Sequence, residues 1–220
     1  MQYTKEKAVV LFTGGIDSSV LLYESKKSYE VLPVYFDQRT NVAFHELSAV
    51  DAIVKTLGLS CEVLAIPEFP PTVFGVRVPR YLAAYPEFAV GEYSEACGAC
   101  AFFARAFRYA GVNTILIGVN KSDAENYPAL DDYLAACENY LNVGVPSEKH
   151  IKYVAPLRQL SKCDVVKRGL ELDVPLASTW SCLMGPLDHC GVCAQCLRRV
   201  KAFSTAGVKD TTRYRAPVIP

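Results

Sequence analysis

The segment best suited to phosphate chemistry is residues 13–19, Thr-Gly-Gly-Ile-Asp-Ser-Ser. It follows the apolar run 8–12 and precedes the apolar run 20–23, an order that predicts a buried strand, a phosphate loop and a helix. Glycines let backbone N–H groups approach an anion, serine hydroxyls can donate to it, and the helix start adds the positive end of its dipole. We therefore expect phosphate to be bound by Phe12, Thr13, Gly14, Gly15, Ser18 and Ser19.

Asp17 lies inside this loop and would repel a phosphate unless a cation lies between them. The loop therefore predicts a hard metal ion, and Mg²⁺ is the usual choice beside phosphates. Alternatively, a Gly-Gly turn can precede an Asp-Ser helix cap with no ligand at all. The loop is not a Walker loop, because no Gly-Lys-Ser or Gly-Lys-Thr follows it.

Cys182, Cys190, Cys193 and Cys196 form the second chemical signal. Four thiolates with two short gaps at the end of the series can close a tetrahedral shell, and Gly191 eases the turn between them. Zinc is favoured because complete sulfur shells are typical of structural zinc sites, whereas an iron–sulfur cluster or redox thiols are the alternatives. Such a closed site would pin the C-terminal segment to the rest of the chain.

The composition is that of a water-soluble enzyme. The 220 residues are 51% hydrophobic, and 23 Lys and Arg balance 23 Asp and Glu. This balance gives no net field that would recruit nucleic acid or a membrane. Because no signal peptide or membrane-spanning apolar run is visible, we expect a cytoplasmic protein. In that reducing compartment nine cysteines indicate metal binding or thiol chemistry more than disulfides.

Strands and helices that alternate along the chain must position these groups. The expected strands are 8–12, 31–36, 61–66, 114–120 and 154–157. The expected helices are one that follows the phosphate loop, 46–57, 99–109, 131–141 and one that Ser161 caps and that runs to about Leu172. Residues 67–95 interrupt the alternation with Gly and Pro, as active-site loops do.

This alternation predicts an α/β fold, a doubly wound and mostly parallel sheet with helices on both faces. Ligands in such folds bind beyond the carboxyl ends of the strands, where residues 13–19, 37–39 and 118–123 would meet. We expect this fold over residues 1–175. A small zinc-binding helical lobe over residues 176–220 would pack on it.

The chain resembles the 7-cyano-7-deazaguanine synthases over about residues 8–203, through several motifs in the same order. Its first motif also resembles the pyrophosphatase loop of ATP pyrophosphatases, with Thr13 in place of the usual first serine. The motifs are 13–18, Asp37-Gln38-Arg39, Ile117-Gly118-Val119-Asn120, Tyr127-Pro128, Pro156-Leu157, Leu160-Ser161-Lys162, Thr179-Trp180-Ser181-Cys182 and the last three cysteines.

The resemblance implies a zinc-containing, usually dimeric ligase that uses ATP to adenylate the carboxylate of 7-carboxy-7-deazaguanine and releases pyrophosphate. Ammonia then forms the amide, and a second activation by ATP gives the nitrile that enters queuosine biosynthesis. The implied catalytic residues are Asp17 and Asp123, which would hold Mg²⁺, and Lys162, which would contact phosphate. Gly118 is expected to contact the nucleotide. The substrate candidates are Gln38, Arg39, Asn120, Tyr127 and Trp180.

Two of these candidates have an equally plain structural interpretation, in which Arg39 is a solvated loop charge and Trp180 packs under the cysteine lobe. The chain also departs from the family pattern. Residues 92–100 lack the Arg-Asn pair of the family's Val-Pro-x-Arg-Asn element, and residues 129–131 are Ala-Leu-Asp where Asp-Cys-Arg is common. These departures concern the substrate or the nucleophile more than the adenylation.

Three alternatives to the synthase function remain, and the departures favour the first of them. A divergent paralogue, as in bacterial antiviral defence, would transfer the activated carboxylate to another amine, possibly on a protein. A nucleotide-binding module without catalysis is the second. The third is a sulfur transferase that thiolates transfer RNA with Cys97 and Cys100, although the balanced charge predicts no direct nucleic-acid binding and two small buried thiols would also explain the pair.

Overall fold

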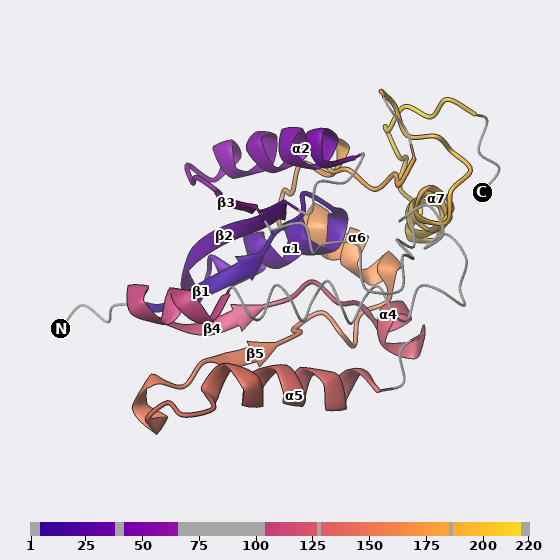
Figure 1. Cartoon of the computed structure of the whole chain (residues 1–220). Coiled ribbons are helices and arrows are strands. Elements are labelled where there is room, and N and C mark those ends of the chain that lie inside the picture. The colour runs from indigo at the N-terminus through magenta and orange to yellow at the C-terminus, as the bar shows by residue number, and fades with distance from the viewer. Residues whose placement is uncertain (1–4, 38–41, 66–103, 127–128, 185–186, 217–220) are drawn as a thin grey trace, which may run out of the picture.

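A computed structural model of the chain describes residues 5–37, 42–65, 104–126, 129–184 and 187–216. Within these residues, five strands form one sheet in the order β3-β2-β1-β4-β5, and all neighbouring pairs are parallel (Figure 1). The strands are β1 (Glu6–Leu11), β2 (Tyr29–Asp37), β3 (Glu62–Ala65), β4 (Val112–Leu116) and β5 (Lys152–Val154). The chain builds the sheet outward from β1 in one direction and then, from β4, in the other. The boundary between β1 and β4 is therefore the switch point of the fold.

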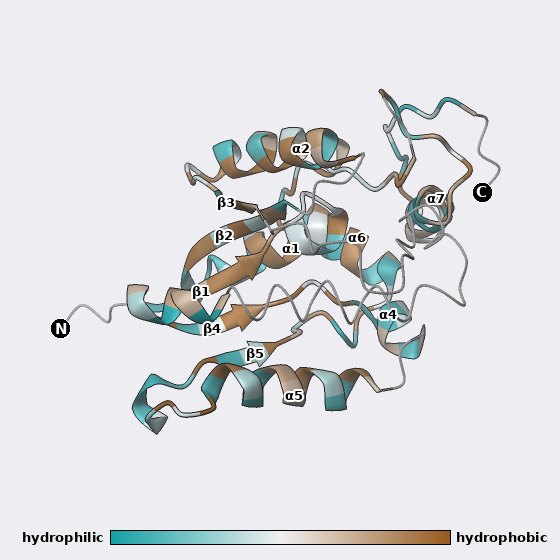
Figure 2. Cartoon of the chain, viewed as in Figure 1, coloured by the Kyte–Doolittle hydropathy of each residue, from teal (hydrophilic) through white to brown (hydrophobic). Residues whose placement is uncertain are grey.

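Helices cover both faces of this sheet. They are α1 (Ile16–Ser25), α2 (Ala43–Thr56), α4 (Lys121–Asn126), α5 (Leu130–Asn142), α6 (Lys162–Glu171), α7 (Ala194–Ala206) and the 3-10 helices η2 (Arg105–Ala110), η3 (Ser147–Lys149) and η4 (Leu176–Ser178). Alternate residues of β1 enter different cores: Ala8 and Val10 pack with α1, α2 and α6, whereas Val9 and Leu11 pack with α5. Figure 2 shows the strands as a mainly hydrophobic layer between helices of mixed hydropathy. The expected doubly wound α/β fold is confirmed.

Most expected elements are present, with ends that differ by a few residues. The helix expected after Ser161 is α6, and its start is a capping box: Asp164 N–H donates to Ser161 Oγ (3.2 Å), and Ser161 N–H donates to Asp164 Oδ2 (3.2 Å). The described part of the expected helix 99–109 is instead largely the 3-10 helix η2. Gly111 caps its C-terminal end with a positive φ of 80°. The six-residue α4 was not predicted, because so short a helix has little apolar periodicity.

Two expected strands have wrong ends. The strand expected at 114–120 ends at Leu116, because the chain then turns to pack Gly118 directly against the phosphate loop. The strand expected at 154–157 is instead β5, which ends at Val154. Pro156 has no N–H for a ladder, and Arg158 N–H donates back to Ala155 O (3.3 Å) in a turn.

The outer edge of β5 is covered by side chains of α5. Asn142 brackets the peptide of Ile151: its Nδ2 donates to Ile151 O (2.8 Å), and Ile151 N–H donates to its Oδ1 (2.8 Å). Two residues further on, within β5, Tyr153 N–H donates to Glu138 Oε2 (2.8 Å). Three backbone groups that this edge would offer to another strand are therefore already bonded: Ile151 N–H, Ile151 C=O and Tyr153 N–H.

The C-terminal helix α7 packs on the main domain. Its Ala202 and Phe203 belong to the same buried cluster as Val20 of α1 and Val165 of α6. The lobe thus shares a core with the sheet domain, and the division at residue 175 stays a prediction. In the described part of the chain, no helix combines the length and the apolar character needed to cross a membrane.

Candidate functional site

The phosphate loop lies at the carboxyl end of β1, and the loop 117–120 lies at the carboxyl end of its neighbour β4. Both loops therefore flank the switch point, where ligands bind in doubly wound sheets. Two glycines allow the phosphate loop to lie close to its neighbours, Gly14 on the side of α2 and Gly118 on the side of the loop 117–120. Gly14 has a positive φ of 71°, and a Cβ there would lie 2.9 Å from Ala49 Cβ and 3.0 Å from Val50 N of α2. A Cβ on Gly118 would lie 3.0 Å from Ser18 N.

Internal hydrogen bonds hold the loop in shape. Thr13 N–H donates to Ser18 Oγ (3.3 Å), and Ser18 Oγ donates to Gly15 O (3.3 Å). Ser19 is fully buried, and its hydroxyl donates to Gly15 O (2.6 Å). Phe12 is also buried, with its ring in the core. The structure therefore places the side chains of Phe12 and Ser19 in the frame of the loop rather than at its surface.

Asp17 is the centre of a polar cluster drawn from three distant parts of the chain. Lys162 Nζ, at the start of α6, donates to Asp17 Oδ2, and the two side chains are 21% and 18% exposed. Asn120 Nδ2, after β4, donates to Asp17 Oδ1 (3.3 Å). The backbone also joins the two loops that bring these groups in, because Lys121 N–H donates to Leu160 O (2.8 Å).

Asp123 is the second carboxylate near this cluster. Burial raises its pKa, and the negative charge of Asp17 raises it further, while a hydrogen bond from Asn120 N–H (3.1 Å) lowers it. A buried carboxylate whose charge is disfavoured by a neighbouring carboxylate is a ligand that a hard divalent cation would stabilise. Asp17 and Asp123 thus fit Mg²⁺ by their chemistry, and Lys162 supplies the positive charge already present.

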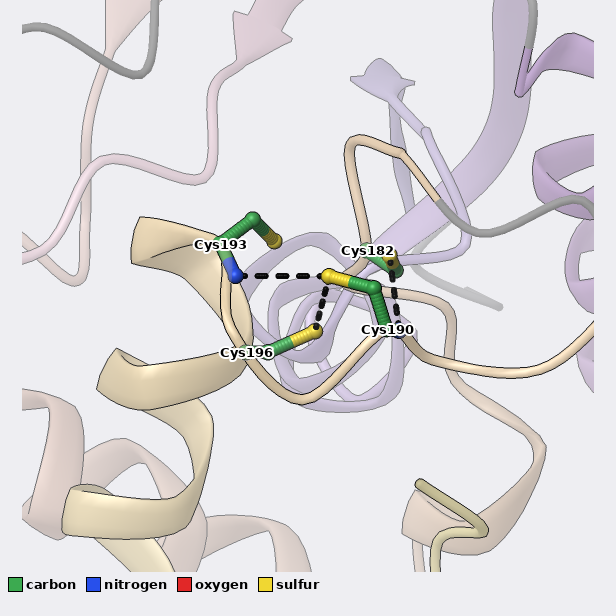
Figure 3. A group of neighbouring side chains, drawn as sticks. All are labelled: Cys182, Cys190, Cys193 and Cys196. Atoms are coloured by element: carbon green, nitrogen blue, oxygen red, sulfur yellow. Dashed lines mark hydrogen bonds between the residues drawn. The ribbon is translucent and has the colours of Figure 1, made fainter. Parts of the chain in front are cut away.

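The four C-terminal cysteines come together (Figure 3), with their sulfur atoms all within 4.8 Å of one another. Cys190 Sγ and Cys196 Sγ are 3.9 Å apart, close to the edge of roughly 3.8 Å that a tetrahedron of Zn–S bonds near 2.3 Å requires. Backbone N–H groups of Cys190 and Cys193 donate to Cys182 Sγ (3.2 Å) and Cys190 Sγ (3.3 Å), so hydrogen bonds hold these two sulfur atoms in place. Gly191 makes the turn with a positive φ of 80°. The set fits a structural zinc site.

A scan against family models then decides the family. The model described as "Queuosine biosynthesis protein QueC" matches residues 7–71 and 99–207, which are most of the chain. The chain belongs to the QueC family.

Curated relatives agree with this assignment over nearly the full length. A 7-cyano-7-deazaguanine synthase of a Nitratiruptor species is 33% identical over 224 residues, covering 96% of this chain and 99% of that protein. The protein of the same name from Thermoplasma volcanium is 34% identical, covering 95% of this chain and 91% of that protein. That from Nautilia profundicola is 31% identical, covering 96% and 99%.

In this QueC-family chain, Trp180 joins the phosphate loop to the cysteine lobe. Its N–H donates to Gly14 O (2.9 Å), and its indole Nε1 donates to Cys182 O (2.8 Å). Its ring stacks on His45 of α2, with centroids 4.3 Å apart, and also contacts His189 at 4.3 Å. These contacts favour the packing interpretation of Trp180 over substrate binding.

His189 is held neutral in this contact. Burial and the nearby Arg199 lower its pKa to about 4. Its Nε2 is then free of a proton and accepts a hydrogen bond from Ser181 N–H (3.0 Å). His189 therefore supports the segment that carries Trp180.

Arg199 is the main residue that sequence reasoning missed. It is almost fully buried, at 1% exposure, and its guanidinium donates to Thr179 Oγ1 (2.7 Å), Leu176 O (2.8 Å) and Asp210 Oδ2 (3.1 Å). One buried cation therefore ties α7 to the segment 176–181 and to the C-terminal segment. Its only sequence signal is its place three residues after Cys196, on the next turn of the predicted helical lobe.

The remaining candidates lie outside the described residues: Gln38, Arg39, Tyr127, Cys97 and Cys100. The positions that depart from the family pattern at 130–131 are described, and they have structural partners. Leu130, the first residue of α5, is buried in the core, and Asp131 pairs with Arg158.

Proposed function

We propose that this protein activates the carboxylate of 7-carboxy-7-deazaguanine with ATP. A carboxylate oxygen would attack the α-phosphorus of ATP, the bond to the bridging oxygen would break, and pyrophosphate would leave. Ammonia would then displace AMP from the acyl carbon and lose a proton to give the amide. In a second round the amide oxygen would attack the α-phosphorus of another ATP and release pyrophosphate. The nitrogen would then lose both of its protons as the C–O bond breaks and AMP leaves with that oxygen, giving 7-cyano-7-deazaguanine.

The observation that carries this proposal is the convergence of Asp17, Asp123 and Lys162 at the mouth of a glycine-rich phosphate loop. Pyrophosphate is a leaving group only if its developing charge is neutralised. Backbone N–H groups around Gly15 would hold it, and Lys162 would turn from Asp17 toward it. Asp17 and Asp123 would hold Mg²⁺, which supplies the additional positive charge when bound.

The cysteine lobe would hold zinc in a structural role. Full sulfur coordination leaves no position for a reacting molecule. The lobe would act on the reaction only by supporting Trp180 and, through it, the phosphate loop. We also propose, from the resemblance, that two copies of the chain form a homodimer that works without a nucleic-acid or membrane partner.

The test is to incubate the purified protein with ATP, Mg²⁺, 7-carboxy-7-deazaguanine and ammonium, and to measure pyrophosphate and identify the products by mass spectrometry. The nitrile is the expected product. Absence of carboxylate-dependent pyrophosphate release would overturn the proposal. Replacing ATP by a non-cleavable α,β-methylene analogue is the matched control, because it fills the site but cannot release pyrophosphate.

A second candidate is transfer of the activated carboxylate to another amine, including one on a protein. It is favoured by residues 72–98, which the QueC family model leaves unmatched, and by Ala129 and Asp131 at positions where the family commonly carries Asp and Arg. In the same assay, this candidate predicts pyrophosphate release and an adenylate that hydroxylamine traps. Ammonium would then give neither amide nor nitrile.

A further inference from the structure

The side chain of Asn120 makes more hydrogen bonds than a residue that only caps a helix would need. Asn120 precedes α4, and its Oδ1 accepts hydrogen bonds from Ser122 N–H (2.9 Å) and Asp123 N–H (3.3 Å). Asp123 Oδ2 accepts a hydrogen bond from Asn120 N–H (3.1 Å), so the two residues form a reciprocal cap at the start of this short helix. Capping alone would be served equally well by Ser, Thr or Asp.

The remaining contact explains why the residue is an asparagine. Asn120 Nδ2 donates to Asp17 Oδ1 (3.3 Å), across 103 residues of sequence. Serine and threonine are shorter and would use their oxygen for the cap, and aspartate has no donor for a carboxylate. Only an amide can accept from the α4 backbone with one atom and donate to Asp17 with the other.

The surroundings leave this amide no other role. Asn120 is 3% exposed, so its amide has almost no surface to offer a substrate. Lys162 donates to the other oxygen of Asp17, so each carboxylate oxygen has one fixed partner. Asn120 thereby sets Asp17 and Asp123 in a single arrangement, one by its side chain and the other by its backbone.

We infer that Asn120 is a positioning residue that orients Asp17 and Asp123 for a divalent cation, and that it is not the substrate contact expected from the sequence. The inference rests on the proposed function, because it assigns to Asn120 the task of preparing that same site for Mg²⁺ and ATP. Residues that orient metal ligands typically change metal affinity by roughly 10- to 100-fold when they are replaced.

The test uses Asn120→Ser in the full-length protein, with ATP binding measured by isothermal titration calorimetry at a series of Mg²⁺ concentrations. Serine keeps the cap, so the melting temperature should stay close to that of the unaltered protein. The Mg²⁺ concentration for half-maximal ATP affinity should rise roughly 10-fold or more. Asn142→Ser is the matched control, because Asn142 also bonds backbone groups but lies at the β5 edge; it should lower stability and leave the Mg²⁺ midpoint unchanged.

A double-mutant cycle with Asp17→Asn distinguishes positioning from a purely structural role. If Asn120 acts through Asp17, adding Asn120→Ser to Asp17→Asn should change ATP binding no further. An unchanged Mg²⁺ midpoint in Asn120→Ser, or full additivity in the cycle, would overturn the inference. Should Asn120→Ser fail to fold, Asn120→Thr gives the same comparison, since threonine also caps.

The outcomes separate this inference from the proposed reaction. Mg²⁺-dependent ATP binding that shifts in Asn120→Ser, without turnover of 7-carboxy-7-deazaguanine by the unaltered protein, would support the positioning role and overturn the reaction. If the unaltered protein shows no Mg²⁺-dependent ATP binding, both are overturned.

Discussion

At Gly14 the phosphate loop leaves less room than one methyl group needs. The residue combines a left-handed backbone with contacts from α2 on the side where a Cβ would lie. Gly144 has the same φ of +71° but nothing within 4 Å of its Cβ position. An alanine substitution at Gly144 therefore tests backbone strain alone, whereas one at Gly14 tests strain together with lack of space.

Gly14→Ala should destabilise the protein by about 2–5 kcal/mol, since overpacking of about 1–3 kcal/mol adds to left-handed strain of about 1–2 kcal/mol. Gly144→Ala should cost only the strain, about 1–2 kcal/mol. Urea unfolding of both variants measures the difference. If both variants lost the same free energy of unfolding, α2 would have shifted to make room for the added methyl group, and the loop would be less tightly packed than its contacts indicate.

Lys162 makes the ion pair with Asp17 inside the cluster. Lys162→Ala should lower the rate of pyrophosphate release by roughly 100-fold, the usual cost of losing one preorganised group at a developing charge. Lys167→Ala removes an exposed lysine from the same helix and should leave the rate unchanged. A rate for Lys162→Ala close to that of Lys167→Ala would remove Lys162 from the proposed mechanism.

The sequence indicated the individual members of this cluster but not all of their roles. Asp17 and Lys162 were predicted from motifs, and the structure brings them together although 145 residues separate them. Asn120 was predicted to contact substrate, but its amide is used by Asp17 and by the start of α4. A motif shows which residue types occur together. It does not show which groups the Asn120 amide bonds, because these partners depend on the turn that follows β4.

Among the elements, α7 is fixed by a buried ion pair. Burial raises the pKa of Asp210, but the charge of Arg199 and hydrogen bonds from Tyr214 and Thr212 outweigh it, so the pKa lies below its ordinary value. A depressed carboxyl pKa stabilises the folded state above the unfolded pKa of about 3.9, and this contribution is lost as the pH falls through the folded pKa.

Asp210→Asn should therefore cost about 3–5 kcal/mol at pH 7, because it leaves the Arg199 cation buried without its counter-charge. The difference in free energy of unfolding between the variant and the unaltered protein should begin to shrink below about pH 4, where Asp210 becomes protonated in the unfolded chain. It should be smallest below the folded-state pKa of Asp210, where both proteins carry a neutral side chain at position 210 in both states. Both proteins release any bound metal in acid, so the comparison cancels that effect. A difference that stays constant down to pH 3 would contradict the ion-pair explanation.

The sequence predicted elements well where apolar runs are bounded by turn residues, as at β1, β2 and α5. It failed where tertiary contacts end an element. β4 stops because Gly118 meets the phosphate loop, and this contact is with a segment about 100 residues away in sequence. Arg199 was missed for a similar reason, since a basic residue on an amphipathic helix is usually solvated and only the fold shows that this one is buried.

For the whole molecule, Trp180 connects the cysteine lobe to the phosphate loop through hydrogen bonds to both. The protein should contain one zinc ion per chain by elemental analysis. Because Trp180 bonds both Cys182 O and Gly14 O, removal of zinc by a strong chelator should lower the melting temperature and also weaken ATP binding. Cys190→Ser should reproduce both effects.

Cys163→Ser is the matched control, because Cys163 is also half-buried but lies outside the cysteine cluster. It should leave the zinc content and the ATP affinity unchanged. ATP affinity that survives chelation while the melting temperature falls would show that the lobe stabilises the chain without supporting the loop.

The bonded edge of β5 has a consequence for how copies of this chain can associate. Sheets that end in an open strand can grow from molecule to molecule, and this is a common route to fibres. Here Glu138 and Asn142 block the addition of a strand to β5, since an incoming strand would first have to break their hydrogen bonds to Ile151 and Tyr153. These bonds thereby disfavour open-ended polymerisation through strand addition at β5.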